Sequence, residues 1–138
     1  MTTNIENENN KLNEETKQKL KDLSRAMLRL HATLLDGEKA KYEEANGKIA
    51  SPYAYLQLVL DDEHFSWLRK ISALIALIDE ATSVRRPASE PEAQALLDET
   101  RVLLNFEDND EHFNEKFQIA LQNNAGAVLN HNDARSFL

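Results

Sequence analysis

The chain has 138 residues, of which 41% are hydrophobic and 29% charged, and it carries a net charge of −8 and no cysteine. This length and composition are typical of one soluble globular domain with one core. The acidic balance disfavours nucleic acids and anionic membrane surfaces as partners, and the missing thiols exclude disulfides, thiolate metal sites and cysteine nucleophiles.

The amino-terminal residues 1–12 are rich in Asn and Glu and nearly free of apolar side chains. Such a segment cannot offset the entropy of ordering, so we expect a flexible tail before a single domain over residues 13–138. It has no apolar core of the kind a signal peptide needs, and no apolar run in the chain is long enough to cross a bilayer. Together with the absence of cysteine, this predicts a cytoplasmic protein.

A long first helix is predicted from about residue 13 to residue 45. Leucine and methionine side chains spaced by three and four residues form its apolar seam, which consists of Leu20, Leu23, Met27, Leu30 and Leu34. Leu28, His31 and Leu35 are expected to widen this apolar face. Asn46 and Gly47 should end the helix, because glycine favours the position after a helix C-terminus.

A short second helix is predicted from Ser51, as its cap, through Pro52 to about Leu60. Asp61 should then cap a third helix over residues 62–82. Apolar side chains fall on nearly all sides of that helix: Phe65, Trp67, Leu68, Ile71, Leu74, Ile75, Leu77 and Ile78. We therefore expect the segment 71–78 to be enclosed by neighbouring helices at the centre of a bundle.

Three further helices are predicted in the remaining third of the chain. Ser89 and Glu92 form a capping box for the fourth helix, whose buried side should hold Leu96, Leu97, Leu103 and Leu104. Asn109 or Asp110 should cap the fifth helix, with Phe113, Phe117, Ala120 and Leu121 packing inward. A last helix should follow Asn124 and pack through Val128, Leu129 and Phe137.

No segment alternates apolar and polar residues in the manner of a strand. The predicted fold is therefore all-α, a single-domain bundle of five to six helices around a buried central helix.

The histidines and acids raise the question of a metal site, with His31, Asp61, His64 and His112 as candidate ligands. Carboxylate-bridged metal bundles use Glu-x-x-His on two helices. Here Asp61-x-x-His64 has this spacing with aspartate in place of glutamate, whereas Asn109-x-x-His112 has asparagine in place of the acid. The chain also lacks a glycine-rich phosphate loop and a nucleophile motif. We expect no catalytic residue, cofactor or metal.

A buried polar pair is the preferred interpretation of His31. It lies near the middle of the apolar face of the first helix, while Ser72 and Asp79 fall within the apolar arc of the third. A buried carboxylate is costly unless it is paired. We expect Asp79 to pair with His31, or with Arg85 or Arg86, as a structural anchor that fixes the helix register.

Three segments of the chain resemble a group of small, uncharacterised bacterial all-helical proteins with no assigned activity. They are "LHATLLDGEKAKYE", "SPYAYLQLVLDDEHFSWLRKISALIALIDE" and "FQIALQNNAGAVLNH". The resemblance covers most of the chain from about Leu20, and the middle segment is its distinctive part. Asp62 stands where the group's pattern leads us to expect a proline. The resemblance implies a bacterial, cytoplasmic, stand-alone domain.

The function expected from these patterns is that of a non-enzymatic interaction or scaffold protein that forms a homo-oligomer, such as a homodimer. The seam of the first helix could extend past the body and pack against a second copy. The alternative is a metal- or small-molecule-binding bundle, a hydrolase or oxidoreductase with histidine and carboxylate ligands. A third reading is a ligand pocket lined by Trp67, Tyr53 and Tyr55.

Overall fold

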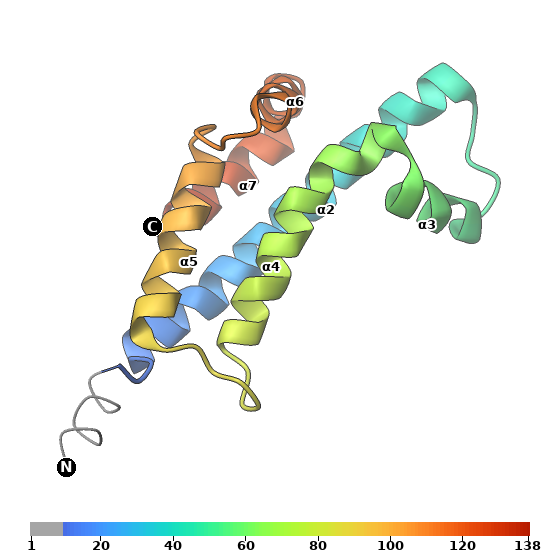
Figure 1. The fold of residues 1–138 in the computed structure, drawn as a ribbon. Coiled ribbons are helices and arrows are strands. Elements are labelled where there is room, and N and C mark those ends of the chain that lie inside the picture. The colour runs from blue at the N-terminus through green and yellow to red at the C-terminus, as the bar shows by residue number, and fades with distance from the viewer. Residues whose placement is uncertain (1–9) are drawn as a thin grey trace, which may run out of the picture.

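A computed structural model describes residues 10–138 and confirms the all-α fold (Figure 1). Within this range the chain forms six α-helices and one 3-10 helix and no named strand. The elements are α2 (Glu14–Asn46), α3 (Pro52–Asp61), η1 (Glu63–Leu68), α4 (Arg69–Ala81), α5 (Glu90–Leu104), α6 (Glu111–Gln122) and α7 (Ala125–Arg135).

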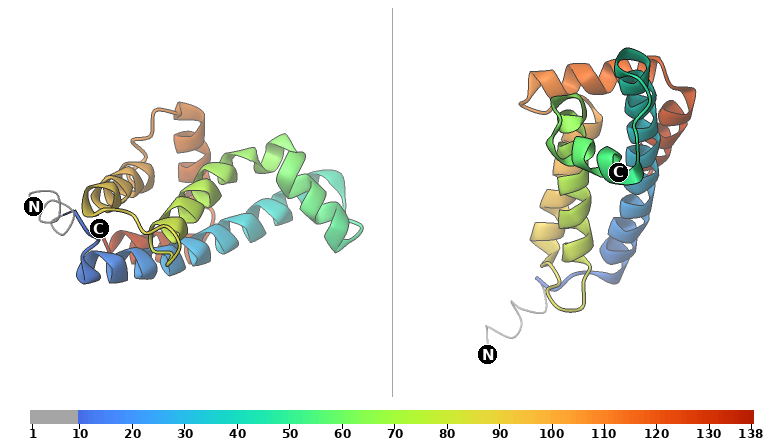
Figure 2. Two further views of the ribbon diagram at one scale, coloured as in Figure 1. Left: turned by 60° about the horizontal axis from the view of Figure 1, so that its bottom comes forward. Right: turned by 90° about the vertical axis from the view of Figure 1, so that its right-hand side faces the viewer.

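The long helix α2 is the element on which the others are assembled. Helices α4 and α7 lie along it, η1, α5 and α6 also contact it, and α6 crosses the remaining helices at one end (Figure 2). The carboxyl-terminal part of α2 reaches beyond α5 and α7, and α3 lies at that far end (Figure 1). The fold therefore has a packed body and a projecting end made by the tip of α2, α3 and η1.

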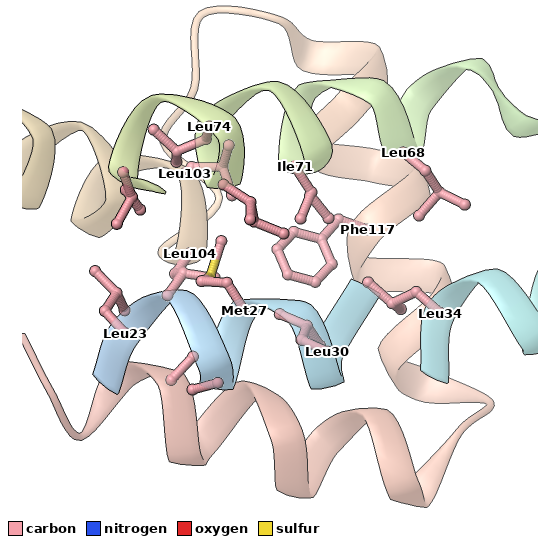
Figure 3. Close-up of a cluster of buried hydrophobic side chains, with 14 of the residues drawn as sticks. Leu23, Met27, Leu30, Leu34, Leu68, Ile71, Leu74, Leu103, Leu104 and Phe117 are labelled. Atoms are coloured by element: carbon pink, nitrogen blue, oxygen red, sulfur yellow. The ribbon is translucent and has the colours of Figure 1, made fainter. Parts of the chain in front are cut away.

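The core confirms the predicted seam of the first helix. All five seam residues of α2 are buried, and they meet buried side chains from η1, α4, α5 and α6 (Figure 3). Phe117 lies between α2 and α4, close to Leu30 and Ile71. Because the whole seam from Leu20 to Leu34 is covered within one chain, it offers no surface for packing against a second copy.

Helix starts agree with the capping chemistry of the sequence. Ser51 accepts a hydrogen bond from the backbone N–H of Ala54, and Ser89 and Glu92 form the complete capping box of α5. Asp110 and Asn124 cap α6 and α7 through their side-chain oxygens. Each cap satisfies a backbone N–H that would otherwise have no partner at a helix start.

Two helix boundaries depend on local backbone geometry. Gly47 ends α2 with φ 87° and ψ 168°, a conformation that residues with a Cβ atom rarely adopt. The predicted third helix begins as the 3-10 helix η1, and its cap is Asp62, not Asp61, which is the last residue of α3. The single residue between α3 and η1 turns the chain back towards the body.

Several predictions of burial were wrong. Leu28 on α2 is exposed. Val128 and Leu129 are exposed as well, because α7 instead packs through Ala127, His131 and Ala134. The segment 71–78 is enclosed on one side only, since its exposed residues are Ser72, Ala73, Ala76 and Leu77. Helix α4 is therefore a wall of the core and keeps one face open to solvent.

The predicted tail lies mostly outside the described residues, which begin at Asn10. Residues 10–12 lie against the start of α5, where the carbonyl of Asn10 accepts a hydrogen bond of 2.7 Å from the N–H of Glu90. Leu12 packs partly buried against the core. The described chain thus contacts the rest of the domain from a few residues before α2.

Candidate functional site

Helix α3 is the least covered element of the fold. None of its ten residues is buried, although most of them are apolar. Tyr53, Leu56 and Leu60 are all exposed, and their spacing of three and four residues places them on one face. A contiguous exposed apolar face of this kind is typical of an interaction site. We refer to these three residues as the α3 face.

The opposite side of α3 is held against the body by aromatic and aliphatic contacts. Tyr55, Leu58 and Val59 are partly buried against the core. The ring of Tyr55 lies edge-on to Phe65 with ring centroids 6.1 Å apart, and the Nζ atom of Lys39 lies 4.9 Å from the centre of the same ring. The α3 face is therefore presented by a helix that is already fixed, which lowers the entropy cost of binding.

The hydroxyl of Tyr55 is buried without a hydrogen-bond partner. Burial raises its pKa above the ordinary value, and the nearby carboxylates of Asp36 and Glu43 raise the pKa further. The phenol therefore stays protonated at neutral pH and adds no charge beneath α3.

A histidine–carboxylate contact joins α2 to η1 at the base of the projecting end. The Oε2 atom of Glu38 lies 2.9 Å from the Nε2 atom of His64, with side-chain exposures of 8% and 31%. The same nitrogen lies 2.8 Å from the backbone carbonyl of Glu38, and Lys41 lies 3.8 Å from the other carboxylate oxygen. The rings of Tyr42 and Phe65 pack beside the imidazole.

The predicted pair of His31 and Asp79 is not formed. Asp79 is exposed, and its carboxylate accepts a hydrogen bond from the hydroxyl of Ser24. Among the described residues, neither His31 nor an arginine at 85 or 86 is bonded to it. His31 is only half-buried, and burial lowers its pKa.

Three polar residues of α2 recur at intervals of seven residues. Ser24 and Glu38 lie seven residues before and after His31, so all three share one side of the helix. Ser24 contacts α4 and Glu38 contacts η1, which places this polar row along the edge where the third predicted helix packs. The seven-residue spacing from His31 thus marks Ser24, which contacts Asp79, and Glu38, which contacts His64.

The candidate metal ligands are not brought together. Among residues 10–138 no group of three or more histidine and carboxylate side chains is arranged to hold a metal ion. His31 lies on α2, Asp61 on α3, His64 in η1, and His112 exposed on α6. His64 contacts a single carboxylate, that of Glu38.

The acids before α6 have structural partners. Asp108 lies 2.7 Å from the Nζ atom of Lys70 and accepts a hydrogen bond from the N–H of Asp110. Burial alone would raise the pKa of Asp108, but these two partners lower it below the ordinary value. The segment thus joins α4 to the start of α6.

His131 is a buried titratable group in the core, next to Phe106 and Phe117. Its Nε2 atom donates to the carbonyl of Leu104 at a distance of 2.8 Å. Burial lowers its pKa and nearby Arg135 lowers it further, while the bond to Leu104 acts in the opposite direction. The folded protein therefore binds a proton at this site less readily than the unfolded chain does.

We expect the free energy of unfolding to fall as the pH is lowered through about 6.5, the ordinary histidine pKa. The unfolded state then takes up protons that the folded state excludes from His131 and His31. Urea unfolding at a series of pH values should show this loss, and His131→Gln should make the dependence on pH less steep. An unchanged slope in that variant would contradict the assignment.

The surface of residues 10–138 has three depressions of similar size. One of about 500 Å³ lies at the turn between α2 and α3, next to Leu58 and Asp62. A second, of about 570 Å³, lies between α4 and α5, and a third, of about 490 Å³, lies between Leu12 and the connection from α4 to α5. Tyr55 lines a smaller depression of about 270 Å³, whereas Trp67 is buried against Phe113 and Phe117. The aromatic residues proposed to line one pocket are therefore spread over separate places.

None of the helices within residues 10–138 combines the length and hydropathy needed to span a bilayer. Comparison of the chain with protein-family models, with curated protein sequences and with solved structures finds no match.

Proposed function

We propose that this protein is a non-enzymatic helical interaction protein that associates with a second copy of itself through the α3 face. The observation that carries the proposal is a fixed, apolar helix of ten residues with none of them buried. A helix of this composition gains free energy when its uncovered face is removed from water.

Self-association is supported by the distribution of charge around α3. The chain carries a net charge of −8, so two copies repel each other over most of the surface. Residues 52–61 hold only one charged side chain, that of Asp61, and Lys48 precedes the helix. Paired α3 helices therefore bring few like charges together.

The size of the α3 face indicates a weak complex. Its three side chains expose on the order of 300 to 400 Å² per copy, and a standard protein–protein interface buries about 800 Å² per partner. We therefore expect a dimer whose population rises with concentration. A cytoplasmic, bacterial setting is part of the same proposal, since it is supported by the cysteine-free sequence and by the resemblance to small bacterial helical proteins.

The metal-binding alternative has no support from residues 10–138, because no three histidine and carboxylate side chains there are grouped closely enough to hold a metal ion. The acidic surface likewise gives no support to binding of nucleic acid.

The substitution Leu56→Asp tests the proposal. Leu56 lies at the middle of the α3 face and is 52% exposed, so an aspartate there costs the folded monomer little but places two like charges in the interface. Leu28→Asp is the matched control, because Leu28 is 51% exposed on α2, away from α3. Light scattering over a range of concentrations should show dimers for the wild type and for Leu28→Asp, and monomers for Leu56→Asp.

A wild-type protein that stays monomeric at the highest concentration would contradict the proposal. Loss of the dimer in both variants would do so as well. Circular dichroism should show the same helix content in all three proteins.

A further inference from the structure

The open side of α4 is a second uncovered apolar surface, distinct from the α3 face. Ala73, Ala76 and Leu77 are exposed there, although the helix carries apolar residues on nearly all sides. Helix α5 follows α4 through a short connection and lies beside it (Figure 1). The two helices pack against the core on one side and leave a furrow between them on the other.

This furrow is a groove of about 570 Å³ with an apolar floor and a charged rim. We name it the α4–α5 groove. Leu77, Ala81, Ala88 and Leu96 contribute to its floor. A groove between two neighbouring helices, floored by leucine and alanine, has the shape that accepts a third helix by its apolar face.

The rim of the α4–α5 groove determines which kind of helix fits. Glu80, Glu92 and Glu99 line it, and Arg86 is the one basic residue among the lining residues of this groove. The guanidinium of Arg86 lies 3.6 Å from the carboxylate of Glu80, so one of the three acids is already partly neutralised. Glu99 is exposed at the other side of the rim, and the groove as a whole is acidic.

We propose that the α4–α5 groove binds a basic amphipathic helix of a partner protein. Apolar side chains of that helix, at positions i, i+3 or i+4, and i+7, would cover Leu77 and Leu96, while flanking lysines or arginines face Glu92 and Glu99. The docked helix completes the bundle around α4. Exposed rim charges of this kind raise the association rate and select the partner more than they add affinity.

A second copy of this chain does not fit the groove. Its α3 helix, residues 52–61, contains no lysine or arginine to meet the glutamates, and the open side of its α4 is bordered by the same acidic rim. The proposal is therefore independent of self-association through the α3 face. With both surfaces in use, the protein would act as a scaffold, with one surface for self-association and another for a partner helix.

The test uses the full chain and a synthetic 18-residue peptide with leucines at helical spacing and lysines on either side. Two control peptides have the lysines replaced by glutamates, or the same composition in an order without helical periodicity. Fluorescence anisotropy of the labelled peptides measures binding. We expect saturable binding of the basic helical peptide, weaker binding at higher ionic strength, and no binding of either control.

Protein variants locate the binding surface. The double substitution Glu80→Lys and Glu99→Lys should raise the Kd at least about tenfold, and Leu77→Ser should raise it as well. Ile119→Ser is the matched control, because Ile119 on α6 and Leu77 are both 48% exposed. Glu92 is left unchanged, since it belongs to the capping box of α5.

Three outcomes would overturn the proposal. They are no binding of the basic helical peptide, equal binding of the non-periodic peptide, and equal effects of Leu77→Ser and Ile119→Ser. Light scattering of the Leu77→Ser protein should still show the dimer, so that failure of this proposal can be distinguished from failure of self-association through α3.

Discussion

Replacing Phe117 by alanine is expected to lower the free energy of unfolding by about 3–5 kcal/mol, the range for deleting a buried aromatic side chain. Phe117 on α6 is fully buried and lies where α2, α4 and α6 meet (Figure 3). Its ring packs against those of Trp67, Phe106 and Phe113. The cavity left by alanine would be walled by several helices that cannot all move inward.

The control for Phe117→Ala is Ile119→Ala, two residues away on the same helix. Ile119 is 48% exposed, so its truncation removes little buried surface and should cost about 1 kcal/mol or less. Urea unfolding of both variants measures the difference. Equal losses in the two variants would mean that the core is not organised around Phe117.

Replacing His64 by leucine is expected to lower the free energy of unfolding by about 2 kcal/mol. The carboxylate of Glu38 is nearly fully buried, and His64 is its close partner, while Lys41 lies 3.8 Å away and is more exposed. Removing the imidazole leaves a buried carboxylate without a close donor, which costs about 1–3 kcal/mol. His64 itself is partly exposed, so we do not expect the full cost of breaking a completely buried ion pair.

A double-mutant cycle isolates this effect from the lost packing of the imidazole. In the His64→Leu background, Glu38→Gln should recover part of the stability, because a neutral amide is less costly to bury than a carboxylate. In the wild-type background the same substitution should be destabilising. If Glu38→Gln had the same effect in both backgrounds, the contact between Glu38 and His64 would make no contribution.

The sequence predicted the helices well because their signals are local. The caps at Ser51, Ser89 and Asn124 depend on a side chain and a backbone N–H three residues away, and all three are present. The seam of α2 depends only on helical periodicity, and its five residues are buried. Helical periodicity determines which side chains share a face, and the most apolar face of a long helix is the one that packs against the core.

The partners of polar groups were predicted poorly because they depend on how two helices are placed side by side. Asp79 lies within the apolar arc of its helix, yet α2 approaches α4 in a register that leaves Asp79 exposed beside Ser24. The same register brings Glu38 to His64. A histidine–carboxylate pair does join α2 to the segment that follows α3, but it consists of two other residues.

The uncovered surfaces could not be predicted from composition alone. An apolar helix such as α3 or α4 is expected to be buried, and the sequence does not state how many neighbours the chain has available to cover it. Six shorter elements follow α2 within residues 10–138, and their packing leaves Leu56 and Leu77 exposed. These are the two places where we propose that other chains bind.

The chain contains no cysteine, so a single introduced cysteine reports directly on the proposed pairing of α3 helices. In an antiparallel pair, Leu56 lies near the two-fold axis, where two copies approach within the distance that a disulfide bridges. Leu56→Cys should form disulfide-linked dimers under mild oxidation much faster than Leu28→Cys, a cysteine of equal exposure on α2. Equal rates for the two variants would contradict self-association through α3.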